Sequence, residues 1–577
     1  MSDGTLDAVT LALVQNRLDH ITKQMGWVMT RTARSPIFNH AHDFSCYLTD
    51  RTGTIVAQAD GIPIHTGGGG FAARALIAAF GDTIVEEDAY LLSDPYVAGG
   101  NHLPDWVILR PVFCDGTLTA FSCIRAHQSD IGGGAAGTYN PEAEEIFHEG
   151  IRLPPLKLVD RGEIREDVWK LLMINCRTPH YLDGDLRAML GATRIGAEQV
   201  AEHLTELGVA QGLAYMDGIL DHADKRLRVA IADLPDGTYK GEDRFDNDCF
   251  EPMDIPIKAA VTVKGDAMTI DFTGSHEQIR GFKNSSFANT YSSVYMALSA
   301  FFDPAIPRNE GTYRNVEIVA PEGTIVNPRP PAPMTMNTVF PACEIIHAVW
   351  RALSKADPDR SCAGWGKNAF PITSGLGEDG NTFVMYHWFG SSGGGAVDGR
   401  DGFPQQGGLN SLCGLRIPNA ESFEQLFPIR FVRQELRRDA AGAGKFRGGA
   451  GGDYAVDIFA PVQYAFRGEG YSMPTGFGMD GGGDGAMGSM KVTPDGGEPL
   501  TPPTYGVRHI APSRLEMLAP GGGGWGDPFE RDPELVLADV KDGIVSETNA
   551  LEIYGVVLKE GAVETSATEK QRAGGRR

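Results

Sequence analysis

The sequence has few features of a secreted, membrane-bound or disulfide-rich protein. Its eight cysteines are scattered and include no Cys-x-x-Cys pair, which argues against a disulfide scaffold and against a thiolate zinc site. No run of about 18 apolar residues occurs, so we expect no membrane span. The N-terminus lacks a basic segment followed by an apolar run, so we expect no signal peptide. These absences predict a cytoplasmic protein in reducing conditions.

Positive charge is also scarce. Lysine and arginine total 51 against 75 aspartate and glutamate, a net charge of −24. Nucleic-acid binding draws on clustered Lys and Arg, so we expect no nucleic-acid partner. No glycine cluster matches G-x-x-x-x-G-K-[ST], and no G-x-G-x-x-G lies within a strand, turn and helix of a βαβ unit. We therefore expect no ATP binding on this chain.

Glycine and proline are abundant, with 73 and 35 residues among 577. They cluster between apolar segments and predict many tight turns and backbone-lined loops. Hydrophobic residues make up 42% and charged residues 22%, which is ordinary for a globular protein with a sizeable core. The length alone suggests about three to four domains at ~150 residues each.

Hydrophobic periodicity places helices and strands in alternating blocks. Helices are predicted over 5–34, 71–80, 164–233, 290–303, 340–356 and 532–554, with a break between two helices at Asp183–Asp185. Strands are predicted over 43–60 as a hairpin, at 89–92, 106–113 and 118–126, over 234–274, and as short strands after 365.

These blocks predict an α+β protein with several mixed domains. The predicted regions are a metal-site α+β region (1–160), a helical region (161–235), an α+β middle region (236–365) and a β-rich, glycine-rich C-terminal region (366–577).

Three good metal ligands lie between Leu92 and Gly134. His102 and Asp105 flank a Leu-Pro pair, so they belong to a turn or strand entrance rather than a helix interior. His127 follows a strand-like run that could return the chain to the same place. Two imidazoles and a carboxylate suit a hydrolytic metal such as zinc or manganese. The alternative is that these are strand-end polar residues tied to the backbone.

Two further segments carry candidate site residues. Asp43, in the ligand-rich sequence NHAHD, is a plausible fourth metal ligand. Asp130 could be a base or could orient the His127 imidazole, and it could equally cap the turn that opens the following glycine run. His65 precedes four glycines and a helix, an arrangement that could hold an anion, although tight-turn packing is the favoured explanation.

Several motifs follow one another in a characteristic order along the chain. They are HDFSC, GIPIHTGG, DPYVAGG, NHLPD, RAHQSDIGG, EIFHEGIRLPPLKL, GDLRAMLGA, PRNEGTYR, KFRGGAGG and APGGGGWGDP. Through these motifs, which span essentially the whole sequence, the chain resembles the hydantoinase B / 5-oxoprolinase family. The family includes ATP-dependent hydantoinases, 5-oxoprolinases, a caprolactam-opening enzyme, and the acetone and acetophenone carboxylases.

The resemblance implies one half of a two-part enzyme. A hydantoinase A-type partner with an actin-like ATPase fold would bind ATP and phosphorylate an amide or enol oxygen, and this B-type chain would hold the metal. The expected assembly is a hetero-oligomer such as a dimer of heterodimers. The implied metal ligands are His102, Asp105, His127 and a carboxylate near Asp43. Many members carry an acidic residue shortly before DFSC, where this chain has His40 and His42. Asp43 is therefore the predicted fourth ligand, with His40 as the alternative.

The predicted activity is ATP-dependent opening of a cyclic amide such as a hydantoin, 5-oxoproline or a lactam. His127 and Asp130 are the predicted catalytic residues, with Asp130 or Asp43 accepting a proton from water. One alternative is a subunit of a ketone carboxylase of the acetone or acetophenone type. The other is a scaffold subunit whose metal is structural.

Overall fold

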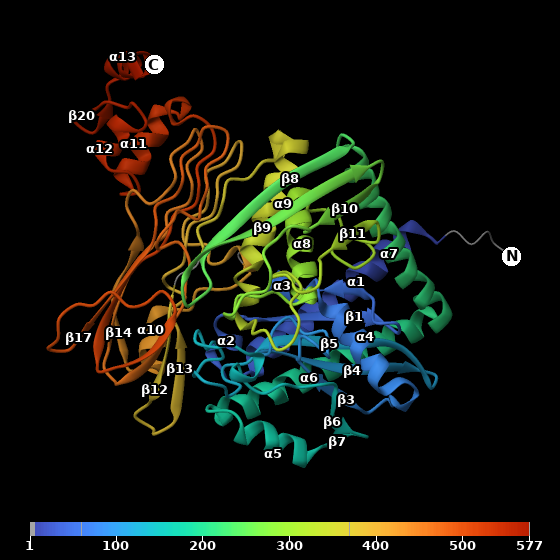
Figure 1. Ribbon diagram of the computed structural model, residues 1–577. Helices are drawn as coiled ribbons and strands as arrows, with labels where there is room; N and C mark the ends of the chain where they lie inside the picture. The colour runs from blue at the N-terminus through green and yellow to red at the C-terminus, as the bar shows by residue number, and fades with distance from the viewer. Residues whose placement is uncertain (1–5, 59–60, 368–369, 413, 576–577) are drawn as a thin grey trace. The chain divides into compact units, whose positions relative to one another are not determined.

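The computed structural model describes residues 6–58, 61–367, 370–412 and 414–575. The chain divides into two compact units. The first contains Met1–Arg244, Asp248–Ala356 and Gly414–Arg416, and the second contains Phe245–Asn247, Asp357–Cys413 and Ile417–Arg577. Helices and several separate sheets occur, which confirms the predicted mixed α+β class (Figure 1). The four predicted regions remain a prediction beside these two units.

The first unit holds most of the helices. They are α1 (Ala8–Thr32), α2 (Pro36–Asn39), α3 (Pro63–Thr66), α4 (Gly69–Phe80), α5 (Glu166–Ile174), α6 (Pro179–Leu207), α7 (Val209–Ala232), α8 (Phe287–Phe301) and α9 (Ala342–Ala356). The strands from the same part of the chain are β1 (Phe44–Asp50), β2 (Ile55–Gln58), β3 (Ala89–Leu92), β4 (Asp105–Cys114), β5 (Thr117–His127), β6 (Leu156–Asp160), β7 (Glu163–Ile164), β8 (Gly237–Asn247), β9 (Pro252–Lys264), β10 (Ala267–Asp271) and β11 (Val316–Val319).

An antiparallel seven-stranded sheet, in the order β2-β1-β5-β4-β3-β6-β7, is the core of this unit. Because side chains alternate between the faces of a strand, neighbouring residues of β5 pack against different helices. Phe121 and Cys123 join a buried cluster with Leu76 of α4. Ser122 faces the other way, where its Oγ lies 3.6 Å from the sulfur of Met25 in α1. Helices α1 and α6 therefore cover one face, and α4 covers the other.

A second sheet, in the order β11-β10-β9-β8, completes the first unit, with α9 packed on β9 and α8 packed on α9. Figure 1 shows these two helices, in yellow and light green, beside the long strands β8 and β9. None of the helices in the described residues combines the length and the apolar character that crossing a membrane requires.

The predicted helix break at Asp183–Asp185 is wrong, because α6 runs through it without interruption. The Asp185 carboxylate accepts the backbone N–H groups of Arg34 and Ser35, at 2.7 and 3.0 Å. Its hydrogen-bonding capacity is therefore used between elements and does not compete with the helix backbone. The helical region breaks instead at residues 175–178, between α5 and α6, and at Gly208, whose φ of 79° a side-chain-bearing residue rarely adopts.

The second unit contains two four-stranded sheets, in the orders β13-β12-β16-β18 and β14-β15-β19-β17. Its strands are β12 (Ile372–Leu376), β13 (Thr382–Tyr386), β14 (Ile429–Leu436), β15 (Gly452–Ile458), β16 (Val462–Phe466), β17 (Ser489–Pro494), β18 (Gly506–Ile510), β19 (Ser513–Leu518), β20 (Leu558–Lys559) and β21 (Ala562–Val563). Its helices are α10 (Ala420–Leu426), α11 (Pro533–Lys541), α12 (Glu547–Glu552) and α13 (Thr565–Gly575).

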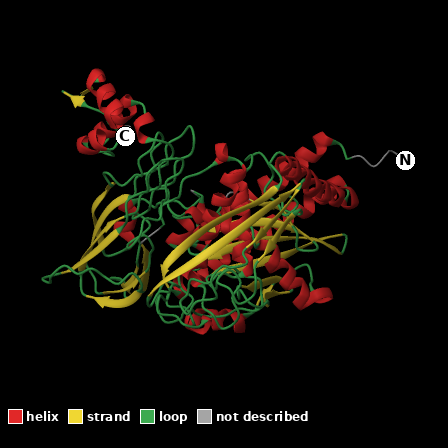
Figure 2. Cartoon of the chain, turned by 45° about the horizontal axis from the view of Figure 1, so that its top comes forward, coloured by secondary structure: helices red, strands yellow, loops and turns green. Residues whose placement is uncertain are grey.

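Glycine-rich segments of this unit run alongside one another as extended chain outside the sheets, and Figure 2 shows them among the green loops. We call this the glycine bundle; its segments are 391–396, 440–451, 476–485 and 519–526. Backbone hydrogen bonds join the segments, such as Gly449 N–H to Gly394 O at 2.8 Å and Gly522 N–H to Gly449 O at 3.0 Å. A Cβ at Gly522 would lie 2.0 Å from Gly394 O. Close backbone packing, rather than tight turning, therefore explains the glycines at positions 449 and 522.

A buried histidine in the second unit predicts a pH-dependent stability. His387 lies between the Thr373 hydroxyl, at 3.0 Å, and the Tyr454 hydroxyl, at 2.9 Å. Burial lowers the pKa of His387 from 6.5 to about 3. The unfolded chain therefore binds a proton at His387 near pH 6.5, whereas the folded chain binds it only near pH 3. The free energy of unfolding consequently decreases as the pH falls from about 6.5 towards 3. We expect this site to contribute a slope of about 1.4 kcal/mol per pH unit.

Urea unfolding of the wild type and of His387→Gln at pH 7, 6, 5 and 4 checks this expectation. The free energy of unfolding of the wild type, relative to that of the variant, should fall steadily below pH 6.5. Parallel stability curves would show that His387 does not titrate between the folded and unfolded states.

Candidate metal centre

Three neighbouring inner strands of the seven-stranded sheet, β1, β5 and β4, have ends that lie side by side. Asp105 begins β4 and His127 ends β5, and the two residues are directly paired in the antiparallel register. Asp43 immediately precedes β1, and its carbonyl oxygen accepts the N–H of His127 at 3.1 Å. The hairpin of β4 and β5 thus returns His127 to the turn that carries His102, as expected from the sequence.

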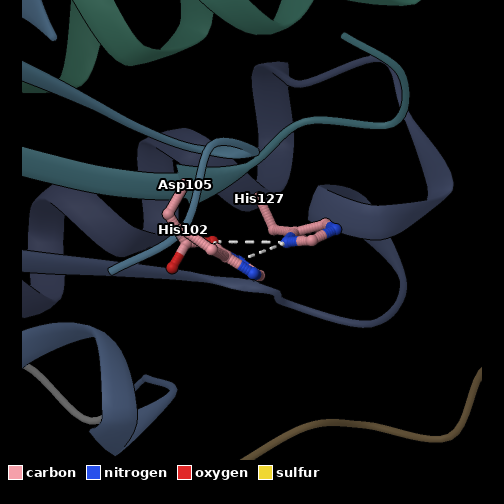
Figure 3. A group of neighbouring side chains, drawn as sticks. All are labelled: His102, Asp105 and His127. Carbon is pink, nitrogen blue, oxygen red and sulfur yellow. Dashed lines mark hydrogen bonds and ion pairs between the residues drawn. The ribbon is translucent and has the colours of Figure 1, made fainter. Parts of the chain in front are cut away.

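The side chains of His102, Asp105 and His127 converge from these strand ends and form a buried cluster (Figure 3). His102 Nε2 lies 2.7 Å from Asp105 Oδ1. His127 Nδ1 lies 3.2 Å from each of those two atoms. One ligand atom from each residue therefore fits within 4.8 Å of the others, a spacing that a single metal ion can bridge.

The orientation of the imidazoles fits a divalent cation. His102 Nδ1 lies 2.5 Å from the carbonyl oxygen of Thr335, to which it can only donate. In the neutral ring, Nε2 then carries the lone pair and points at Asp105 and His127. Asp105 Oδ2 is buried and has no hydrogen-bond partner among the described residues. Lone pairs that converge in this way repel one another unless a cation lies between them.

The electrostatics agree with a cation-binding centre. Burial lowers the pKa of His102, but the charge of Asp105 and its hydrogen bond outweigh burial and raise it. Burial likewise acts to raise the pKa of Asp105, yet His102 and His65 hold it well below its ordinary value. For His127, burial dominates and lowers the pKa. The Asp105 carboxylate is therefore ionised and the His127 imidazole is neutral, which are the forms in which these groups bind metal.

His65, for which the sequence suggested an anion-holding turn, lies in this centre. Its Nε2 is 3.5 Å from Asp43 Oδ1 and 3.5 Å from Asp105 Oδ2, so the ring stands between two carboxylates. Burial lowers the pKa of His65 to about 4. The segment GIPIHTGG was the one available signal, since it places a histidine at the entrance of a helix that packs on the same sheet face.

Asp43 lies beside the three-residue cluster rather than within it. Its side chain is 18% exposed, and its charge acts to raise the pKa of both His102 and His127. His40 lies at the C-terminal cap of α2, and its pKa is lowered by burial. Asp43 thus supplies a carboxylate beside the cluster, and the choice between Asp43 and His40 as fourth ligand stays a prediction.

Asp130 anchors the glycine loop that follows β5. Its buried carboxylate accepts the N–H groups of Gly132 and Gly137 and forms an ion pair with Arg177 at 3.1 Å. This loop carries Thr138, whose hydroxyl lies 3.2 Å from His127 Nε2. The geometry supports the turn-capping alternative for Asp130, and through that loop Asp130 holds a contact on the far side of the His127 ring.

Comparison with known proteins places the chain among relatives of the predicted kind. The family model described as hydantoinase B/oxoprolinase matches residues 7–528. Caprolactamase subunit beta from Pseudomonas jessenii is 35% identical over 600 residues, covering 99% of this chain and 100% of that protein. The crystal structure of ATP-dependent caprolactamase from Pseudomonas jessenii superimposes with a TM-score of 0.92 at 34% identity, covering 99% of this chain and 100% of the matched one.

A nucleotide-free structure of acetone carboxylase shares the fold, with a TM-score of 0.87 at 20% identity over 98% of this chain and 83% of the matched one. The ordered motifs, the fold and the family model agree along most of the sequence. The chain belongs to the hydantoinase B/oxoprolinase family.

Proposed function

We propose that the chain is the metal-holding subunit of an ATP-dependent hydrolase that opens cyclic amides. The observation that carries this proposal is the buried cluster of His102, Asp105 and His127 at the strand ends. The proposal is also supported by the similarity of this chain to caprolactamase subunit beta, which extends over nearly the whole of both chains. A hydantoin, 5-oxoproline or a lactam is the proposed substrate class.

Four side chains would hold the metal. His102 Nε2, Asp105 Oδ1 and His127 Nδ1 are the proposed ligand atoms, and Asp43 is the proposed fourth ligand because its carboxylate faces the same centre through His65. Two imidazoles with carboxylates suit zinc or manganese. When bound, such an ion polarises a water molecule and lowers the pKa of that water to near neutrality.

The residues of the chain would divide the remaining work. Asp105 is fully buried, but His102 and His65 hold its pKa well below its ordinary value, so the carboxylate stays ionised beside the imidazoles. Asp43 is the more exposed of the two carboxylates, which makes it the better candidate to accept a proton from attacking water. Asp130 is the other acceptor proposed from the sequence, and its ion pair with Arg177 makes it primarily an anchor of the loop over His127.

ATP would be used on a partner subunit of hydantoinase A type, in a hetero-oligomer such as a dimer of heterodimers. Phosphorylation of the amide oxygen there would make the ring carbon susceptible to water at this centre. The cytoplasm is the proposed compartment, since none of the seven described cysteines forms a disulfide. Ketone carboxylation is the second candidate, because the acetone carboxylase fold is shared.

A substrate panel with the co-purified partner tests the proposal. We expect ATP consumption and ring opening with a lactam or hydantoin, in equal amounts and without added bicarbonate. The chain without its partner is the control and should open no ring. ATP turnover that requires both a ketone and bicarbonate would contradict the hydrolase and support the carboxylase.

A further inference from the structure

Glu149 is a buried carboxylate that the predicted mechanism does not use. It follows the short 3₁₀ helix Ile146–His148 and is 1% exposed. Its Oε1 accepts the N–H groups of Met334 and Thr335, at 2.9 and 2.6 Å, and its Oε2 lies 3.0 Å from the N–H of Met334. A single side chain thus binds two successive backbone groups that are 185 and 186 residues away in the sequence.

These two backbone groups belong to the segment that orients a candidate metal ligand. Thr335 begins a 3₁₀ helix over Thr335–Thr338, and its carbonyl oxygen accepts the hydrogen bond from His102 Nδ1 at 2.5 Å. Glu149 fixes the N–H side of this residue while His102 binds its carbonyl. Displacing Glu149 would therefore release the carbonyl that holds the His102 ring.

Burying the carboxyl group of Glu149 carries a cost to the fold. Burial raises the pKa of Glu149 to about 7, although its two backbone donors act to lower it. Apolar side chains of similar volume usually fill a buried position at least as well as an ionisable one. A buried carboxylate with two precisely directed acceptor contacts is thus better explained by the segment that it orders than by packing.

We propose that Glu149 is a positioning residue of the metal centre. It holds the Thr335 carbonyl against His102 Nδ1, so that the ring keeps the tautomer whose Nε2 faces Asp105 and His127. Outer partners of this kind fix the orientation and basicity of ligating histidines. The inference rests on the proposed function, because it assumes that this centre binds a metal.

The test compares metal affinity with stability in the full-length chain. Zinc and manganese affinities are measured by competition with a chromophoric chelator, and thermal unfolding is measured on metal-free samples. We expect Glu149→Gln to weaken metal binding by about 10-fold and Glu149→Ala by up to about 100-fold. Glutamine retains one acceptor oxygen, so it should preserve part of the affinity, and it keeps a folded variant available if the alanine chain does not fold.

Asp185→Asn is the matched control. Asp185 is also 1% exposed, and its Oδ1 also accepts two successive backbone N–H groups, those of Arg34 and Ser35. The hydrogen bonds that it accepts from Arg34 and Ser35 involve no candidate ligand among the described residues. We expect this variant to unfold at a lower temperature but to bind metal as the wild type does.

Three results would overturn the inference, and they separate it from the proposed function. Wild-type affinity in both Glu149 variants contradicts the positioning role alone. An equal loss of affinity in Asp185→Asn shows a general effect of stability and also contradicts that role. A wild-type chain that binds neither metal contradicts the proposed function and the inference together.

Discussion

Substitution of His102 by alanine is expected to abolish tight metal binding and to lower ring-opening turnover by about 10³-fold or more. The imidazole contributes the ligand atom nearest to Asp105, 2.7 Å from its Oδ1. Without it, two ligand atoms of the cluster remain, and the fully buried Asp105 carboxylate loses its shortest side-chain contact. Metal content and turnover are measured on the variant purified together with its partner subunit.

His347→Ala is the matched control for this substitution. His347 is also fully buried and also pairs with a carboxylate, since its Nδ1 lies 2.9 Å from Asp243 Oδ2. We expect the control to lose stability while it retains metal and turnover per folded molecule. If His102→Ala loses its metal but retains turnover, the chain is a scaffold whose metal is structural. If it retains its metal, the assignment of His102 as a ligand is wrong.

The ligand cluster could be predicted because its members depend on local geometry. A turn separates His102 from Asp105, and a single hairpin brings His127 back opposite Asp105. Alternation along the strands then puts Asp105 and His127 on the same face of the sheet. Residue type, spacing and one hairpin suggested these three positions, and the ordered family motifs were needed to favour them over strand-end polar residues.

The rest of the centre could not be predicted from local pattern. Thr335 reaches His102 across 233 residues, and Glu149 reaches Thr335 across 186. Both contacts use backbone groups, which carry no signal of residue type. His65 has the right residue type, but only the packing of α3 beside the sheet shows that its ring stands between two carboxylates. Such contacts depend on the assembled fold.

Composition misled the prediction in one instructive way. Glycine is commonly read as a signal of turns because it permits positive φ. Gly449 and Gly522 are outside that backbone region, yet neither position has room for a Cβ. A run of glycines in the sequence does not distinguish a tight turn from close contact between neighbouring segments of the chain. That distinction appears only when the bundle segments are brought together.

The glycine bundle therefore predicts a large effect from one methyl group. We expect Gly522→Ala to destabilise the second unit by more than about 3 kcal/mol, because the new Cβ would meet backbone atoms on a neighbouring segment, which cannot rotate away as a side chain can. The two nearest are Gly394 O at 2.0 Å and Gly394 C at 2.4 Å. Relief would require separating segments that are joined by the hydrogen bond from Gly522 N–H to Gly449 O.

Gly483→Ala is the control within the same bundle, because its Cβ would have nothing nearer than Ala443 N at 3.5 Å, an ordinary contact. Its N–H also donates to the carbonyl of Ala443, so both glycines take part in the hydrogen bonding between segments of the bundle. Urea unfolding should place Gly483→Ala within about 1 kcal/mol of the wild type. Similar stability of the two alanine variants would contradict close backbone packing as the reason for glycine at position 522. A large difference would show that the bundle needs glycine for its lack of a side chain, and not for conformational freedom.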